Sequence, residues 1–248
     1  MKQVIAMHGW SGDHRIWAPW ERHFIAMGWQ WQSGERGYGH FPPQQPEWRC
    51  DADPIQVQRR VLIGHSLGPH LLREAVLAQA TDVVLLASFS RFVPPGRAGR
   101  ALQTGLMGMQ RCIGTESEVM MLHTFLRRST APANSRGLPP SPISEGLSSA
   151  GRERLQKDLA LLIATKGLPD GLPNQAKVLV VQAGSDGIVA PEAQAQLLED
   201  LHTHQQRAAT VWTLKNTGHA LLQADLLLRV RDWLDDPTST APMQEPKP

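Results

Sequence analysis

The chain has 248 residues, of which 41% are apolar and 19% are charged, with 25 basic and 23 acidic side chains. This length and composition fit one globular domain with a sizeable core, and the net charge of +2 does not favour nucleic acid or a membrane surface as a partner. Two cysteines, Cys50 and Cys112, provide neither a disulfide framework nor a zinc-ligand set. Because no apolar run reaches spanning length and the apolar run before His8 is too short for a secretory leader, we expect a soluble, cytoplasmic protein without metal or cofactor.

The first 88 residues alternate between short apolar runs and helical patterns, and residues 177–235 repeat this rhythm. Strands are expected at 4–7, 29–31, 61–63, 83–87, 178–181 and 209–213, and helices at 15–27, about 67–79, 191–202 and about 220–234. Continuous apolar runs are typical of strands that are covered on both faces. Together with the alternation, they predict an α/β core made of residues 1–88 and 177–235, with a doubly wound, mostly parallel sheet of about six strands.

Residues 89–176 have a different pattern, without an expected strand. Helical fragments are expected near 102–112, 116–126 and 152–165, and the Pro-, Ser- and Gly-rich stretch 131–149 is expected to be a flexible loop. An all-helical insert after the fourth strand of a parallel sheet is best interpreted as a cap, or lid, over the sheet. The last residues, 236–248, contain four prolines and little to bury, so we expect a disordered tail.

A candidate nucleophile lies in the sequence Gly64-His65-Ser66-Leu67-Gly68, which follows an apolar strand and precedes a helical pattern. A G-x-S-x-G motif in this setting forms a sharp strand-to-helix turn that lifts the Ser66 hydroxyl above the sheet. The turn also aims the helix N-terminus at the site, where free N–H groups favour a negatively charged oxygen. The motif therefore predicts a serine nucleophile.

A serine nucleophile needs a base, and the base needs a group that orients it. In this kind of fold the chain order is Ser, then Asp or Glu, then His, with the last two on loops after late strands. Asp186 follows the strand at 178–181 and His219 follows the strand at 209–213, so we expect Ser66, Asp186 and His219 to form a catalytic triad. The alternatives are an N-cap role for Asp186 and an ordinary helix-start role for His219. His65 and His70 flank the turn on the wrong side to act as the base.

Two backbone N–H groups are expected to stabilise the oxyanion of the acyl-transfer intermediate. One belongs to Leu67, the residue after the nucleophile. The other is expected from Trp10, in the loop after the first strand, where Gly9 permits close backbone approach. The Trp10 side chain is either a hydrophobic plug or a wall of the acyl pocket, or both.

These motifs, His8-Gly9-Trp10 included, resemble the α/β-hydrolase superfamily over about three fifths of the chain. The family's usual first two antiparallel strands are expected to be missing. Within the superfamily, the chain is similar to the pimeloyl-[acyl-carrier protein] methyl ester carboxylesterases of biotin synthesis. The likeness rests on the segments 8–12, 86–90, 124–126 and 186–191. It implies a serine esterase with Trp10 and Phe125 in substrate binding, although Phe125 is equally well explained as cap core.

The charge distribution suits an acidic macromolecular partner. Residues 89–176 carry eleven basic and six acidic side chains, a net charge of +5, so the remainder is −3. A basic cap speeds and orients the docking of an acidic partner such as an acyl carrier protein. The docking candidates are Arg127, Arg128, Arg152 and Arg154. The alternative is that these arginines only solvate helix faces.

Two other functions fit the same residues. A general short-chain carboxylesterase, a thioesterase or a lipase-like enzyme would use the same triad. A non-catalytic ligand-binding protein of this fold usually lacks a triad member, whereas all three are in place here.

Overall fold

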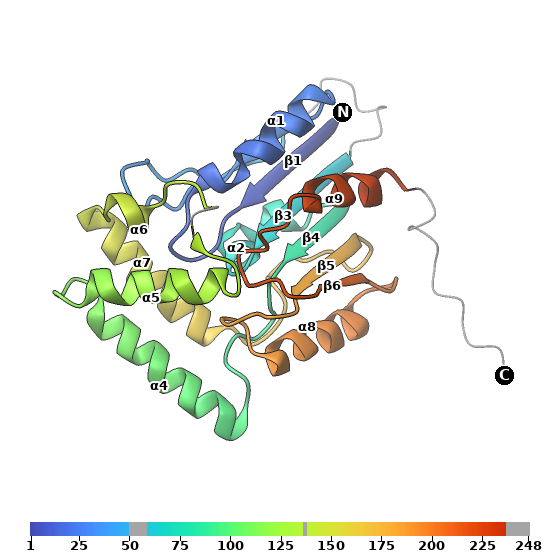
Figure 1. Ribbon diagram of the computed structural model, residues 1–248. Coiled ribbons are helices and arrows are strands. Elements are labelled where there is room, and N and C mark those ends of the chain that lie inside the picture. The colour runs from blue at the N-terminus through green and yellow to red at the C-terminus, as the bar shows by residue number, and fades with distance from the viewer. Residues whose placement is uncertain (50–58, 136–137, 237–248) are drawn as a thin grey trace.

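The computed structural model describes residues 1–49, 59–135 and 138–236. Within them, one six-stranded sheet has all strands parallel, in the order β2-β1-β3-β4-β5-β6. The strands are β1 (Lys2–Met7), β2 (Gln30–Ser33), β3 (Arg59–His65), β4 (Asp82–Leu86), β5 (Lys177–Ala183) and β6 (Thr210–Leu214). Helices lie on both faces of this sheet (Figure 1). The predicted doubly wound α/β fold is confirmed.

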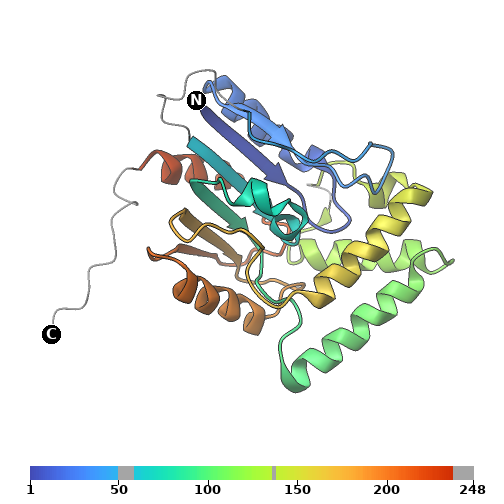
Figure 2. The same cartoon turned by 180° about the vertical axis from the view of Figure 1, so that it is seen from behind.

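The helices fall into a core set and a cap set (Figures 1 and 2). The core set is η1 (His14–Trp17), α1 (Ala18–Ala26), α2 (Gly68–Leu71), α3 (Glu74–Leu77), α8 (Pro191–His204) and α9 (Leu226–Asp235). The cap set is α4 (Gly96–Cys112), α5 (Glu118–Thr130), α6 (Pro142–Glu145) and α7 (Ser149–Ala164). None of the described helices is long and apolar enough to cross a bilayer.

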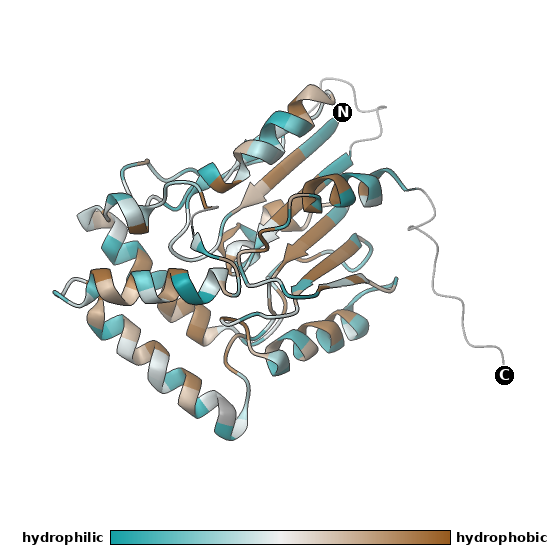
Figure 3. Cartoon of the chain, viewed as in Figure 1, coloured by the Kyte–Doolittle hydropathy of each residue, from teal (hydrophilic) through white to brown (hydrophobic). Residues whose placement is uncertain are grey.

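Alternating side chains of the buried strands supply two apolar layers. Val61 and Leu62 are adjacent in β3 and belong to different clusters, Val61 with Phe24 of α1 and Leu62 with Leu77 of α3 and Leu197 of α8. Both are fully buried, since helices cover the sheet on each side. Figure 3 shows the apolar strands between helices whose outer faces are polar.

The cap set comes between β4 and β5 in the chain and lies beyond the carboxyl ends of the strands, towards which the arrowheads in Figure 1 point. The stretch 131–149, expected to be a loop, contains the short helix α6, which begins at a capping box formed by Ser141 and Ser144. Residues 136–137 of this stretch and residues 237–248 of the expected tail lie outside the described residues.

Two helix predictions need correction. The helix expected at 67–79 is two short helices, because Leu72 is extended (ψ 153°), which lets Leu71 and Leu72 both be buried. The helix expected from residue 220 begins only at Leu226. The preceding residues are held in a loop in which Leu221 has φ +49° and the Ala220 N–H donates to the Ser129 carbonyl. His219 lies at the start of this loop. The residues expected to form the first turns of the helix instead form the loop that holds His219 in place.

A buried ion pair joins the cap to the core. The Arg36 guanidinium donates two hydrogen bonds, of 2.8 and 2.6 Å, to the Asp158 carboxylate of α7, and the Tyr38 hydroxyl donates a third of 2.6 Å. Arg154, also on α7, donates to the Gly37 carbonyl at 2.9 Å. Asp158 is buried, so its charge depends on these partners. The segment after β2 therefore anchors α7.

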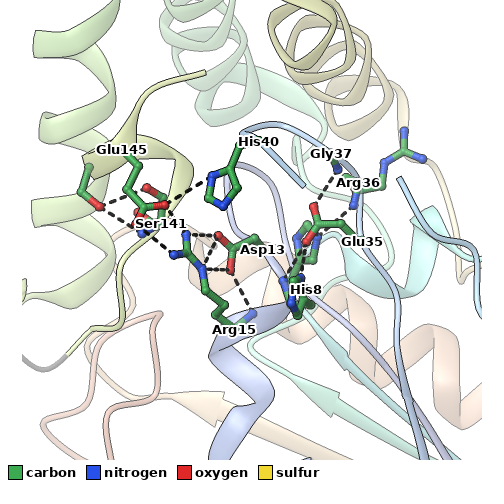
Figure 4. Close-up of polar contacts among 11 residues, drawn as sticks. His8, Asp13, Arg15, Glu35, Arg36, Gly37, His40, Ser141 and Glu145 are labelled. Carbon is green, nitrogen blue, oxygen red and sulfur yellow. Dashed lines mark hydrogen bonds and ion pairs between the residues drawn. The ribbon is translucent and has the colours of Figure 1, made fainter. Parts of the chain in front are cut away.

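A second connection is more exposed and is drawn in Figure 4. Arg15, in η1, donates to both oxygens of Asp13 and to both oxygens of Glu145 in α6. Glu35 lies beside it and accepts hydrogen bonds from the His14 and Gly37 N–H groups, at 3.0 and 2.6 Å. The loops after β1 and β2 are thus linked to each other and to the cap.

The buried Glu35 carboxylate predicts a pH-dependent contribution to stability. Burial opposes its ionisation, but the His8 imidazole and the two N–H donors outweigh burial and lower its pKa from 4.5 to about 2. A lowered folded-state pKa means that the contribution is complete above the unfolded-state pKa and is lost as the pH falls from about 4.5 towards 2. We expect Glu35→Gln to lower the free energy of unfolding at pH 7 by on the order of 3 kcal/mol.

Urea unfolding of the wild type and of Glu35→Gln at pH 7 and pH 3 tests this prediction. The difference between the two proteins should shrink at pH 3. Glu47→Gln is the control, because Glu47 forms an exposed surface ion pair with Arg73, and the substitution should change stability little at either pH. An equal Glu35 effect at both pH values would contradict the assigned cause.

Candidate active site

The turn after β3 holds Ser66 in a strained backbone conformation. Ser66 has φ +55°, a region that residues other than glycine rarely adopt. The strain is maintained by two hydrogen bonds, from the Ser66 N–H to the Leu86 carbonyl at 2.9 Å and from the Ser88 hydroxyl to the Ser66 carbonyl at 2.7 Å. A Cβ atom at Gly68 would clash with the Met7 carbonyl, so glycine is required there. The predicted sharp strand-to-helix turn at Ser66, or elbow, is present, and strained backbone of this kind clusters at functional sites.

The expected acid and base meet although they are 33 residues apart. His219 Nδ1 lies 2.9 Å from Asp186 Oδ2. The other carboxylate oxygen, Oδ1, accepts hydrogen bonds from the N–H groups of Ile188 and Val189 at 2.8 and 2.9 Å. Asp186 therefore orients the imidazole, and the expected alternative of an N-cap role for α8 does not apply, since Ala190 is the N-cap residue.

The charge on Asp186 is stabilised by its partners. Burial opposes ionisation, but the hydrogen bond with His219 and the two backbone donors outweigh burial and lower the pKa of Asp186. An ionised carboxylate at Nδ1 keeps the proton on that nitrogen and leaves Nε2 free to act as a base. The side chains of both residues are nearly inaccessible to solvent, 3% and 1% exposed for His219 and Asp186. Water therefore competes little with their hydrogen bond.

Ser66 and His219 line the same cavity, of about 780 Å³. Ser66 is 5% exposed and His219 is 2% exposed. Within the described residues, the Ser66 hydroxyl has no hydrogen-bond partner, His219 included, although both side chains line this cavity. Catalytic hydrogen bonds in ligand-free enzymes often form only when substrate binds.

The backbone N–H groups of Trp10 and Leu67 are available as oxyanion donors. In the described part of the chain neither donates to another protein group. A Cβ atom at Gly9 would lie 2.9 Å from the Ser66 Cβ and 3.1 Å from the His65 carbonyl oxygen, so only glycine lets this loop lie against the elbow. The two loops that carry the expected donors are therefore in direct contact.

The Trp10 side chain is buried and also lines a cavity. It is 5% exposed, and its Nε1–H donates to the Leu155 carbonyl of α7 at 2.8 Å. Its ring also packs edge-to-face on Phe125 of α5, with ring centroids 5.0 Å apart. Trp10 therefore joins the oxyanion loop to two cap helices and forms part of the cavity wall.

Two cavities meet at Ser66. The larger one is lined by His219 and also by Trp17 of η1 and Trp20 of α1. The smaller one, of about 410 Å³, lies under the cap and is lined mainly by apolar side chains. These include Leu102, Leu106, Met109, Met120, Met121, Leu159 and Leu162. Trp10, Ser66 and Phe125 line both cavities and mark the boundary between them.

The four expected docking arginines differ in their surroundings. Arg127 and Arg128 are exposed at the end of α5, without an ion pair among the described residues, and Arg128 lines the smaller cavity. Arg152 forms an ion pair with Glu118 at 2.9 Å, and Arg154 donates to a core carbonyl. The latter two therefore stabilise the cap itself, and only Arg127 and Arg128 remain free for a partner.

One cluster has the composition of a metal site. Ligand atoms of Asp13, His14 and Glu35 lie within 4.8 Å of one another. However, Arg15 donates to both Asp13 oxygens, and the His14 imidazole and the Gly37 N–H occupy the two Glu35 oxygens (Figure 4). A guanidinium against the carboxylate disfavours a cation, so we assign this cluster to attachment of the cap.

No role for His65 follows from the sequence, although the structure places this residue in the site. Its Nε2 lies 2.9 Å from the carbonyl oxygen of His219, 154 residues away. The one signal in the sequence is its position next to Ser66. A sequence cannot show which distant backbone group a side chain contacts, so the contact with His219 could not be predicted.

Comparison with known proteins agrees with this geometry. A sequence model of the Alpha/beta hydrolase family matches residues 4–232. The fold is similar to the enol-lactonase from Burkholderia xenovorans LB400, with a TM-score of 0.67 and 16% identity over 95% of this chain and 92% of that chain. It is also similar to an esterase from Exiguobacterium antarcticum, with a TM-score of 0.66 and 14% identity over the same shares.

A thermophilic esterase from Thermogutta terrifontis gives a TM-score of 0.62 and 16% identity over 94% of this chain and 89% of that chain. No curated protein matches the chain by sequence. At these identities the structural neighbours establish the fold, whereas the family match spans most of the chain and includes the elbow, the acid and the base. The chain belongs to the Alpha/beta hydrolase family.

Proposed function

We propose that this protein is a serine carboxylesterase. The observation that carries the proposal is the 2.9 Å contact between His219 Nδ1 and Asp186 Oδ2, together with a cavity that both His219 and Ser66 line. A base that is oriented by a carboxylate next to a strained serine is the arrangement that activates a hydroxyl nucleophile. Several structural neighbours are esterases, which supports ester hydrolysis as the reaction class.

The residues have distinct tasks in this reaction. Ser66 Oγ attacks the ester carbonyl while His219 Nε2 takes its proton, and Asp186 stabilises the imidazolium. The N–H groups of Trp10 and Leu67 hold the negatively charged oxygen. His219 then gives the proton to the leaving alcohol, and a water molecule, activated in the same way, releases the acid and restores Ser66.

The two cavities suggest how the substrate is oriented. The leaving oxygen must receive its proton from His219, which lines the larger cavity and not the smaller one. The alcohol group therefore belongs in the larger cavity, and the acyl group belongs in the apolar cavity under the cap. Flexible methionine side chains there can adapt to acyl chains of different shape.

A narrower proposal is that the substrate is the methyl ester of a pimeloyl group on an acyl carrier protein. The supporting observation is the position of Arg128 at the apolar cavity, next to Arg127, with neither in an ion pair within the described chain. In this arrangement the acyl chain leads from Ser66 towards Arg128, where an acidic carrier would dock, and methanol leaves on the His219 side.

The narrower proposal predicts a selective effect of charge reversal. We expect Arg127→Glu/Arg128→Glu to lower kcat/KM for carrier-linked methyl ester by about 10- to 100-fold, because like charges then oppose docking, with a much smaller effect on a free short-chain ester. Steady-state assays with the purified carrier-linked ester and with a chromogenic short-chain ester measure the two kcat/KM values.

The matched control is Arg207→Glu/Arg231→Glu, which makes the same charge change away from the catalytic edge. Arg207 precedes β6, and Arg231 lies in the last turns of α9, whose end contacts the start of β5 through Lys177 and Trp233. Two results would exclude carrier docking at α5 and favour the general carboxylesterase. One is an equal loss of kcat/KM on the carrier-linked and the free ester, and the other is a loss in the control variant as large as that in Arg127→Glu/Arg128→Glu.

Hydrolysis of a chain-length series of p-nitrophenyl esters, together with labelling by a fluorophosphonate, tests the broader proposal. An esterase should hydrolyse the esters and become labelled at Ser66. Faster hydrolysis of matched thioesters would assign a thioesterase instead, and absence of both turnover and labelling would indicate a ligand-binding protein.

A further inference from the structure

His65 connects the nucleophile to the base. It is the last residue of β3 and directly precedes Ser66. Its Nε2 lies 2.9 Å from the His219 carbonyl oxygen, and the two imidazole rings are 5.0 Å apart. A carbonyl oxygen only accepts hydrogen bonds, so His65 Nε2 carries the proton and donates it.

The peptide unit between His219 and Ala220 is held at both ends. Its carbonyl accepts the hydrogen bond from His65, and its N–H donates to the Ser129 carbonyl at the end of α5, at 2.8 Å. A peptide unit is planar, so it cannot turn without breaking one of these two bonds. The backbone orientation at His219, from which the imidazole projects, is therefore set by one core side chain and one cap carbonyl.

Regular secondary structure does not hold this backbone. His219 lies between the end of β6 at Leu214 and the start of α9 at Leu226, in a loop with two positive φ values, +53° at Asn216 and +49° at Leu221. Asp186 orients the imidazole ring, but a hydrogen bond to Nδ1 does not determine where the backbone lies. A separate contact to the main chain is needed, and His65 supplies it.

His65 is suited to a positioning role and unsuited to proton transfer. Burial and the neighbouring His219 lower its pKa to about 4, so it is neutral near pH 7. Its Nε2 is engaged by the carbonyl, and no carboxylate orients its ring in the described structure. It therefore contributes a fixed hydrogen bond beside the catalytic base without adding a competing charge.

We propose that His65 is a positioning residue for the catalytic base: its Nε2–H fixes the carbonyl of His219 and thereby the distance from the imidazole to Ser66. This inference rests on the proposed function in taking His219 as the base. It goes beyond that function in giving a task to the residue between Gly64 and the nucleophile.

Three substitutions separate this role from others. His65→Gln keeps an N–H donor at a similar reach, His65→Asn keeps an amide but is one bond shorter, and His65→Leu removes the donor. We expect Leu and Asn to lower kcat by about 10- to 100-fold with KM within about twofold, because small misplacement of a catalytic group has effects of this size. We expect Gln to stay within about threefold of the wild type.

A second measurement does not require turnover. The Nδ1 proton of His219, hydrogen-bonded to Asp186, is expected at low field in the proton NMR spectrum. It should be retained in His65→Gln and broadened by solvent exchange in His65→Leu and His65→Asn. Thermal melting of each variant reports whether it is folded, and the comparison of Gln with Asn remains informative if Leu does not fold.

Two results would overturn the positioning role. The first is equal activity in Gln, Asn and wild type, with an unchanged NMR signal in all three. The second is loss of activity in Gln as large as in Leu, which would show that a titrating imidazole is needed, since an amide cannot act as a base. Failure of the proposed function is a separate outcome, namely a wild type that neither hydrolyses esters nor is labelled by a fluorophosphonate, and the NMR comparison still tests positioning in that case.

Discussion

Ser66→Ala is expected to lower kcat for ester hydrolysis by about 10⁶-fold, the scale at which removal of a serine nucleophile disables a triad. The melting temperature should change little, because the Ser66 hydroxyl makes no hydrogen bond within the described residues and alanine keeps the same backbone conformation. Steady-state kinetics and a thermal melt on the same preparation test the two parts of the prediction.

Ser90→Ala is a matched control for this experiment. Ser90 is completely buried, and its hydroxyl has no partner in the described structure, so its loss removes a buried serine outside the site. We expect activity close to that of the wild type. If Ser66→Ala retained substantial turnover, Ser66 would not be the nucleophile and the esterase mechanism would be wrong.

Asp186→Asn is expected to lower kcat by about 10⁴-fold while leaving the site geometry intact, as expected for a triad acid. The physical reason is that the N–H groups of Ile188 and Val189 both donate to Oδ1, so this position must be occupied by an oxygen that accepts them. The asparagine amide NH₂ must then face His219 Nδ1. A donor at that place forces the proton onto Nε2, so the imidazole no longer presents a lone pair to Ser66.

The control for the acid is Asp200→Asn, near the far end of α8, where, among the described residues, the carboxylate accepts a hydrogen bond only from Gln196 in the same helix. It should leave kcat unchanged. A pH profile adds a further check, because no pH in the accessible range should restore Asp186→Asn if the defect is a wrong tautomer. Recovery of activity at any accessible pH would contradict the wrong-tautomer explanation.

Much of the site was predictable because it depends on local patterns. The elbow is a five-residue motif between a strand and a helix, and the positions of Asp186 and His219 follow from their places after β5 and β6. Parallel strands bring their carboxyl ends to one edge, so residues after different strands meet there. The same logic placed the Trp10 loop beside the elbow.

Predictions failed where distant contacts override local preference. The helix expected from residue 220 starts at Leu226, since the intervening residues are held by Ser129 of the cap and by His65 of the core. Arg152 was grouped with Arg127 and Arg128 on charge alone, yet it is paired with Glu118, 34 residues earlier. Helical spacing cannot reveal such partners.

By itself, the sequence determined the parallel sheet and the position of the cap in the chain, and it singled out Ser66, Asp186 and His219 as the candidate nucleophile, acid and base, because strand periodicity and turn motifs depend on neighbouring residues. Only the tertiary structure decided which arginines stay free, that Ser66 lies between two cavities, and that His65 holds the backbone of His219. These features depend on groups that meet across 34 residues of chain, for Arg152 and Glu118, and across as many as 154, for His65 and His219, and packing in three dimensions alone brings them together.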